Sequence, residues 1–364
     1  MSLPTCKMFR SHNPLYVKAS SHPLSISTPK ISKTKMSLGR IQSTDWLDDL
    51  ENQISETTAP KQSEEQSCCI YAVPETLIYT NGKDVYRPRV VSIGPHHCSD
   101  DHVQVIKKHK VEFLKLLLLR KELGFNDLMG SIRPLAKEAR ECYSKEINLE
   151  SFNDDDDRFL KMMVLDGCFL IELFLKAADK KSKDPLALIP RAVPYVFGDL
   201  LLLENQIPFF VLEKLFQTCK MREESDASLS LLALRFFNKV MRRPDGVIEK
   251  FLKRPTPNDR KLPLHLLDLV RSSLLVPSEN KGNTPTACRL IHSISKLRRA
   301  GIKLKQRKAE SFLDVKFKSG VIQMPNIIMN YNMKTFLLNC LHSSTCTTAA
   351  PSTSQFTLVS WTAL

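Results

Sequence analysis

Glycine is scarce in this chain of 364 residues, which contains 11 glycines against 21 prolines. Sheet proteins built from many tight turns need glycine, so this ratio argues against an all-β fold and favours helices that end at proline. The ten cysteines include no C-x-x-C pair and fit no disulfide framework, and several stand in apolar runs such as "DGCFLIELF". We therefore expect a reducing, cytoplasmic environment.

The motifs of common nucleotide-binding and hydrolytic enzymes are also missing. The sequence contains no G-x-x-x-x-G-K-[ST], G-x-G-x-x-G, G-x-S-x-G or H-E-x-x-H. This absence argues against phosphate-cradling nucleotide enzymes and the common hydrolases, although it leaves other enzyme classes open. We assign no catalytic, cofactor-binding or metal-binding residue and expect a non-enzymatic protein without a cofactor.

The apolar segment "DLLLLENQIPFFVLEKLF", residues 199–216, is too interrupted to cross a membrane. A spanning helix needs about 20 predominantly apolar residues, and here the polar run Glu204-Asn205-Gln206 and then Pro208 break the apolar stretch. Burying these polar groups in lipid without partners would cost several kcal/mol. We therefore interpret the segment as a core helix with a built-in break.

The residues around the break each have a predicted role. Asp199 can cap a first short helix, and Pro208 is tolerated in the first turn of a second helix. The amides of Asn205 and Gln206 can donate to the backbone carbonyls that the break frees. In the alternative, Glu204 is a general base whose pKa its apolar surroundings raise, but the sequence offers it no paired nucleophile or acid.

Hydrophobic spacing predicts a mainly α (α+β) protein, a multi-helix bundle with little sheet. Short strands are expected near 68–93, where β-formers alternate around "TNGK", and a β-hairpin near 311–328, around Ser319-Gly320. A first helix is expected in "DWLDDLENQISE". The other predicted helices cover 103–123, 127–148, 159–175, 199–220, 227–242, 245–253 and 263–272.

The chain has a net charge of +14, and its basic residues are unevenly distributed along the sequence. Residues 1–44 contain seven basic and no acidic residues, which predicts a disordered basic tail. The same composition is typical of organelle transit peptides, so chloroplast or mitochondrial targeting stays open. The segment 296–308 holds seven more basic residues and no acid. It could bind phosphate groups, but only Phe312 and Phe317 follow it as residues that can stack on bases. We therefore favour a solvated helix followed by an edge strand whose lysines prevent pairing with another strand, over nucleic-acid binding.

Two further clusters have a functional and a structural interpretation. The run "HHCSDDH", residues 96–102, offers imidazole, thiolate and carboxylate ligands of the kind that bind zinc. No second cluster at metal spacing accompanies it, so we favour a turn that leads into an Asp-capped helix. Asp166 stands inside an apolar helix, where it could be a catalytic carboxylate, but we expect it to pair with a base because an unpaired buried charge is costly.

Five motifs in order give the chain a resemblance to a known family. They are "VSIGPHH", "MMVLDGCFLIELF", "DLLLLENQIPFFVLEKLF", "LPLHLLDLVR" and "SKLRRAGIKLK…FLDVKFKSGVIQMPNI". Together they resemble the plant "domain of unknown function 247" family, also called uncharacterised protein family 0481, over about residues 45–340. The resemblance implies a mostly helical plant protein with no established activity or cofactor, acting in recognition through an unidentified protein partner.

The carboxyl end departs from the pattern of that family. Its members usually continue into further helices and one transmembrane helix, which implies a plasma-membrane location. Here 11 of the 24 residues from 341 to 364 are Ser or Thr and none is charged. We therefore expect an atypical Ser/Thr-rich tail over 341–364 and a family domain over 45–340 that is truncated before its membrane anchor.

Overall fold

The computed structural model describes residues 68–347, apart from eleven gaps. The gaps are 101–102, 148, 150–151, 153–154, 180–192, 220–226, 245, 255–261, 275–293, 309–314 and 327–328. The predicted basic tail over 1–44, the helix expected in 45–56 and most of the Ser/Thr-rich tail lie outside the described residues.

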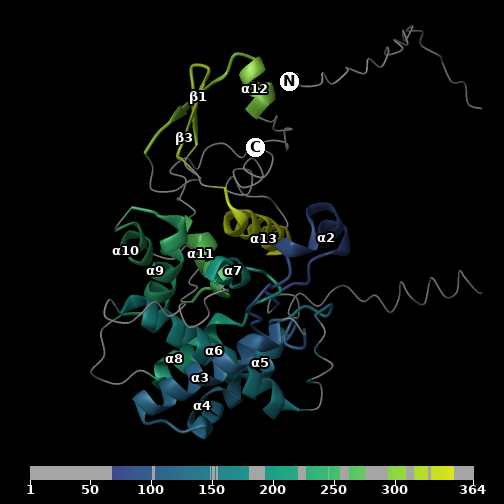
Figure 1. Cartoon of the computed structure of the whole chain (residues 1–364), viewed down its shortest axis with the longest axis vertical. Helices are drawn as coiled ribbons and strands as arrows, with labels where there is room; N and C mark the ends of the chain where they lie inside the picture. Colours follow the sequence, from purple (N-terminus) through teal and green to yellow (C-terminus); the bar gives the residue numbers. More distant parts are fainter. Residues whose placement is uncertain are drawn as a thin grey trace, which may run out of the picture. The chain divides into compact units, whose positions relative to one another are not determined.

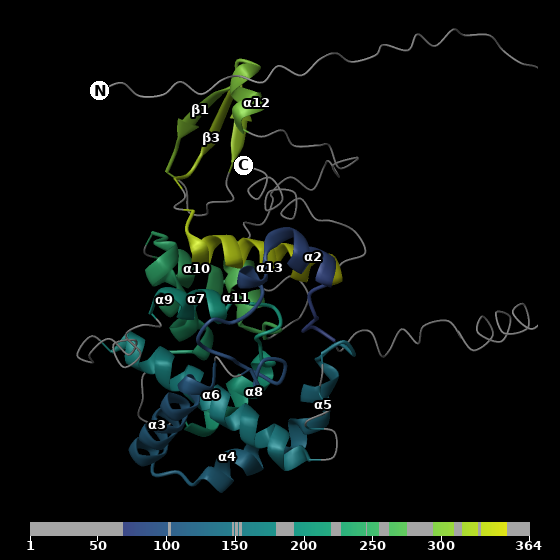
Figure 2. The ribbon, with the colours of Figure 1, turned by 45° about the vertical axis from the view of Figure 1, so that its right-hand side comes forward.

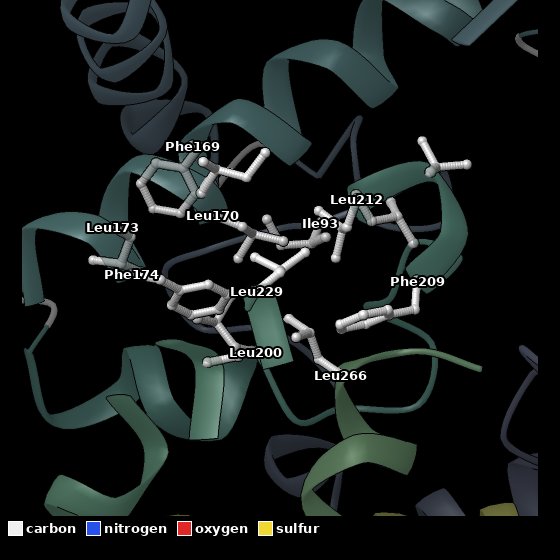
Figure 3. Packing of buried hydrophobic residues seen from close by; sticks show 14 of the residues in the cluster. Ile93, Phe169, Leu170, Leu173, Phe174, Leu200, Phe209, Leu212, Leu229 and Leu266 are labelled. Atoms are coloured by element: carbon white, nitrogen blue, oxygen red, sulfur yellow. The ribbon is translucent and has the colours of Figure 1, made fainter. Parts of the chain in front are cut away.

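The helix α6, Asp156–Ala178, is the centre of the fold. Asp155 caps it by accepting a hydrogen bond from the Arg158 amide at 2.8 Å, and Asp156 and Asp157 stand in its first turn, where the helix dipole favours negative charge. Its apolar side chains are buried almost all round, as predicted for residues 159–175. Figure 3 shows that they meet side chains of other helices and loops in one continuous apolar cluster.

The three helices that pack most extensively against α6 are α3, Gln104–Lys121, α8, Phe209–Cys219, and α9, Leu229–Met241. All three correspond to predicted helices, although α8 begins only after the predicted break. The approach of α8 depends on Gly167 of α6, because a methyl group added there would lie 2.5 Å from Leu215 Cδ1. The "DG" of the apolar motif thus lets two core helices come close together.

The helix predicted over 127–148 is split in the structure. It forms α4, Phe125–Ile132, then a 3₁₀ turn η3, Arg133–Leu135, and finally α5, Ala136–Glu141. The interruption coincides with Pro134, which lacks the amide hydrogen that a continuous helix requires.

The prediction of short strands near 68–93 is wrong for the residues that the structure describes. This segment forms the helix α2, Glu75–Asn81, and the 3₁₀ turn η1, Lys83–Val85; its only β-type pairing there is an isolated bridge between Ile70 and Tyr143. Pro74 precedes the helix, and Gly82 ends it with φ of 93°. The glycine of "TNGK" therefore terminates a helix, a role that the alternation of β-forming residues concealed.

The predicted β-hairpin is confirmed. Strands β2, Lys316–Lys318, and β3, Val321–Met324, are antiparallel and join at Ser319-Gly320. The edge strand expected in the basic segment is β1, Lys303–Gln306, which follows α12, Ile294–Arg299, and pairs with β3 in parallel. The sheet order is β1-β3-β2.

The remaining helices complete a mainly α protein with one small sheet, as predicted. They are α7, Val193–Asp199, α10, Val247–Leu252, α11, Leu266–Leu274, and α13, Tyr331–Thr347. Figures 1 and 2 show α13 beside α2. Asn339 of α13 donates to the Val85 carbonyl at 2.8 Å and accepts from the Leu203 amide at 2.9 Å.

Two observations bear on the carboxyl end. Helix α13 continues through the boundary that the sequence placed between residues 340 and 341. Among the described helices, none combines the length and the apolar character needed to cross a bilayer.

His265 should make the stability of this core depend on pH. The residue precedes α11 and acts as its N-cap, because its Nδ1 accepts from the Asp268 amide at 3.3 Å. Complete burial lowers the pKa of His265 from 6.5 to about 4, while Asp268 raises it and Arg271 lowers it. The unfolded chain therefore binds a proton at His265 more tightly than the folded chain does. The contribution of His265 to the free energy of unfolding should be fully present above pH 6.5 and fall by about 3 kcal/mol as the pH drops to 4.

Urea unfolding at a series of pH values measures this effect. We expect His265→Asn, which keeps a side-chain acceptor at the N-cap, to lose stability less steeply than the wild type between pH 6.5 and 4. Equal slopes for the two proteins would contradict the assignment.

Candidate functional site

Five buried polar side chains hold the break between α7 and α8 together, and we refer to them as the polar joint. They are Asp166, Asp199, Glu204, Asn205 and Gln206. Their partners lie mainly in the loop Arg89–His97, which includes the motif "VSIGPHH". Two motifs far apart in the sequence thus form the two sides of one hydrogen-bonded structure.

Asp199 binds the start of this loop. Its Oδ1 accepts from the Arg89 amide at 3.0 Å, and its Oδ2 accepts from the Val90 and Val91 amides at 2.8 and 2.9 Å. Burial raises the pKa of Asp199 to about 6, although the three amide hydrogen bonds lower it. The prediction that Asp199 caps a following helix is wrong, because it is the last residue of α7 and caps a distant loop instead.

Asn205 and Gln206 satisfy the backbone groups that the break leaves unpaired. The Asn205 amide donates to the Asp199 and Val91 carbonyls at 2.7 and 2.8 Å, and its Oδ1 accepts from the Ile93 amide at 2.6 Å. The Gln206 amide donates to the carbonyls of residues 200 and 202 at 3.0 and 2.7 Å. The prediction that these amides bond freed carbonyls is therefore confirmed.

Asp166 forms a buried ion pair with Lys110. Its Oδ1 lies 2.5 Å from Lys110 Nζ, and its Oδ2 accepts from the Gly94 amide at 2.9 Å. Lys110 also donates to the Ser92 carbonyl at 2.5 Å. Burial raises the pKa of Asp166, and Lys110 opposes that rise. The structure confirms the predicted pairing of Asp166 with a base, and removing either partner would leave a costly buried charge.

A cavity of about 350 Å³ adjoins this ion pair. Ser92, Cys98, Lys110 and Asp166 form part of its wall, and basic side chains of α3 and α6 lie around it. The two charged groups on its inner wall are paired with each other, so the cavity presents no unpaired buried charge from Lys110 or Asp166.

Glu204 lies against two histidines of the loop. Its Oε1 accepts from the Val73 amide at 2.6 Å and lies 3.7 Å from His96 Nε2, while its Oε2 lies 3.4 Å from His97 Nε2. Burial alone would raise the pKa of Glu204, but His97, the Val73 amide and His96 lower it below its ordinary value. The general-base hypothesis required a raised pKa for Glu204, and this expectation is wrong.

The structure brings together only part of the predicted cluster "HHCSDDH". His96 and His97 approach Glu204, and Asp100 Oδ2 lies 3.2 Å from His97 Nδ1. Cys98 has its sulfur 3.6 Å from Ser99 Oγ, and Asp101 and His102 lie outside the described residues. Sequence spacing could not reveal Glu204 as a neighbour, because it comes from a distant motif.

The predicted basic segment 296–308 contains most of α12 and all of β1. Phe312 lies outside the described residues, and Phe317 stands on β2 with its side chain exposed.

Sequence comparison relates the chain to plant proteins. It matches the family model DUF247, described as a plant protein of unknown function, over residues 70–363. The UPF0481 protein At3g47200 of Arabidopsis thaliana is 34% identical over 304 aligned residues, and the alignment covers 76% of this chain and 60% of that protein. The putative UPF0481 protein At3g02645 of the same plant is 32% identical over 219 residues, 58% of this chain and 38% of that protein.

The matched region therefore spans less than two thirds of either relative. No solved structure gives a significant match.

Gly94 should be the least replaceable glycine of the joint. It has φ of 77°, and a Cβ there would collide with the Gln206 carbonyl oxygen. Gly94→Ala should therefore destabilise the protein by about 3 kcal/mol or more, combining backbone strain with steric overlap. Gly246 is a matched control, because its φ is 83° and nothing lies within 4 Å of an added Cβ.

For Gly246→Ala we expect a loss of about 1 kcal/mol from backbone strain alone. Equilibrium unfolding in urea distinguishes the two variants. Similar losses for both would show that the close approach of residues 94 and 206 is unimportant.

Proposed function

The chain belongs to the DUF247 (UPF0481) family of plant proteins of unknown function, and we propose that it acts there as a non-enzymatic protein-interaction module. The buried carboxylates of the joint support the non-enzymatic part of this proposal. Asp166 is neutralised by Lys110, and Glu204 accepts a hydrogen bond from a backbone amide. A reaction at Asp166 would have to break this buried ion pair, and one at Glu204 Oε1 would have to release the Val73 amide.

The outer face of α3 supports the interaction part. This helix buries Ile106, Phe113 and Leu117 on the side that packs against α6. On the opposite side, the side chains of Val111 and Leu119 are 52% and 67% exposed. Apolar side chains gathered on an exposed helix face are typical of protein-binding surfaces.

The charges on this face indicate the chemistry of the partner. Lys107, Lys108 and Lys115 are exposed among the apolar side chains, and Glu112 is the one acid exposed with them between residues 107 and 119. A complementary partner surface would present apolar side chains surrounded by carboxylates. Because the family resemblance implies recognition at the plasma membrane, plant membrane extracts are the first source in which to look for it.

A pair of matched variants tests this surface. Leu119→Glu places an acid in the proposed interface, whereas Phe317→Glu changes a side chain of similar exposure, 65%, on β2. Used as bait, the wild type and Phe317→Glu should retain the same protein from plant membrane extracts, and Leu119→Glu should lose it. Thermal melting should confirm that both variants stay folded.

Two results would count against the interaction proposal. One is that no protein is retained specifically by the wild-type chain from any tissue. The other is that Leu119→Glu retains its partner as well as the wild type does.

A second candidate function, binding of nucleic acid, rests on the register of the small sheet. Lys303 of β1 and Lys318 of β2 both pair with Val321, while Lys305 and Lys316 both pair with residue 323. Paired residues project from the same face of a sheet, so four lysines share one face. The described residues 294–308 and 315–326 contain no acid.

This face offers phosphate contacts but little for reading bases. Phe317 pairs with Ile322 and therefore projects from the opposite face. Binding would be electrostatic, insensitive to base sequence and strongly dependent on salt. We rank it below the protein interaction, because the stacking platforms of single-strand binders are missing from the lysine face.

Gel-shift titration of a labelled single-stranded oligonucleotide across a salt series tests this candidate. The double variant Lys303→Gln, Lys305→Gln should weaken binding and reduce the slope of log affinity against log salt by about 1.4. Lys137→Gln with Lys214→Gln, two exposed lysines elsewhere, is the control. A wild-type chain that binds no oligonucleotide even at low salt would eliminate this function.

A further inference from the structure

We propose that His96, His97 and Glu204 bind one divalent transition-metal ion, and that Zn²⁺ is the ion these ligands fit best. The three residues each offer one ligand atom, and these atoms lie within 4.8 Å of one another. The site is independent of the α3 surface proposed above.

The distances between the ligand atoms suit a zinc ion. His97 Nε2 lies 3.4 Å from Glu204 Oε2, and His96 Nε2 lies 3.7 Å from Glu204 Oε1. Zinc bonds to nitrogen and oxygen of about 2.0–2.1 Å, in a tetrahedron, place neighbouring ligand atoms about 3.3 Å apart. Small side-chain adjustments would therefore bring the three ligands into the coordination shell of one ion.

His97 Nε2 faces the Glu204 carboxylate at 3.4 Å without forming a hydrogen bond to a described residue. The other ring nitrogen, Nδ1, lies 3.2 Å from Asp100 Oδ2, so an N–H at Nδ1 would be directed at that carboxylate. In that tautomer the lone pair of Nε2 points toward Glu204 and is available to a metal ion. His97 is only 4% exposed.

A metal ion bound at Nε2 would complete an arrangement that is well known from zinc proteins. A ligating histidine commonly donates its other ring N–H to a carboxylate, which fixes the tautomer and orients the ring. Asp100, His97 and Glu204 stand in that order here. Asp100 would be a positioning residue, while the two histidines and Glu204 contact the ion.

The donor set also selects the class of ion. Two imidazole nitrogens and one carboxylate suit zinc and neighbouring transition metals, whereas Ca²⁺ and Mg²⁺ prefer shells made of oxygen. His96 is only partly buried and offers an approach from solvent. A bound ion would tie the loop at 96–97 to the break in the core, so it should also raise the thermal stability.

Metal analysis of the full chain tests the proposal. The protein is stripped with a chelator, dialysed against Zn²⁺ or Co²⁺ and assayed for metal per chain by mass spectrometry. We expect one ion per chain. The cobalt form should show visible d–d bands of a tetrahedral site without a thiolate charge-transfer band, since none of the proposed ligands is a cysteine.

Four variants assign the ligands. His96→Gln and Glu204→Gln should lower the zinc affinity at least 100-fold, because removal of a supporting residue already costs about 10–100-fold, and Asp100→Asn should fall within that range. His109→Gln is the matched control, since His109 Nδ1 lies 3.2 Å from Glu112 Oε2 in a more exposed His–Glu pair. It should leave the affinity unchanged.

His96→Gln decides the test if Glu204→Gln fails to fold, because the His96 ring forms no hydrogen bond among the described residues. Three results would overturn the proposal. They are wild-type protein that retains no stoichiometric metal, equal affinity in the wild type and His96→Gln, or a cobalt spectrum dominated by thiolate charge transfer.

Discussion

Where a helix breaks inside an apolar core, the backbone groups that the break exposes need hydrogen-bond partners. The rest of this structure depends on how those partners are supplied. Asn205 and Gln206 supply donors to four carbonyls, and they accept from the amides of Ile93 and Leu267. An unpartnered buried amide or carbonyl costs free energy comparable to a lost hydrogen bond. The break is therefore stable only because side chains and distant loops complete it.

The same demand explains why several motifs far apart in the sequence meet in the structure. The motif "VSIGPHH" provides the loop, "DGC" provides Asp166 and the close approach at Gly167, and "LPLHLLDLVR" provides the α11 amide that Gln206 accepts from. These motifs are mutual partners around one polar joint. The polar joint thus belongs to the core, and the features proposed for function lie at its edge or on the surface.

The two histidines give Glu204, a structural residue of the polar joint, its proposed second role in metal binding. Glu204 closes the break by accepting the Val73 amide, but its second oxygen remains directed toward His97. His97 Nε2, 3.4 Å from this oxygen, has no hydrogen-bond partner among the described residues. The proposed zinc site and the core therefore share one carboxylate, so metal binding and folding should be coupled.

The local sequence determined most of the helices, the break between α7 and α8, and the hydrogen bonds that compensate for this break. Amphipathic spacing, proline and amide side chains all act over a few residues. The local sequence therefore predicted α3, α6 and the roles of Asn205 and Gln206, and it placed the β-hairpin at Ser319-Gly320. It mistook α2 for strands, since β-forming residues outweighed a proline start and a glycine stop. Only the tertiary structure decided that Asp199 caps a distant loop and that His96 and His97 meet Glu204, because residues more than a hundred positions apart become neighbours only when the core packs.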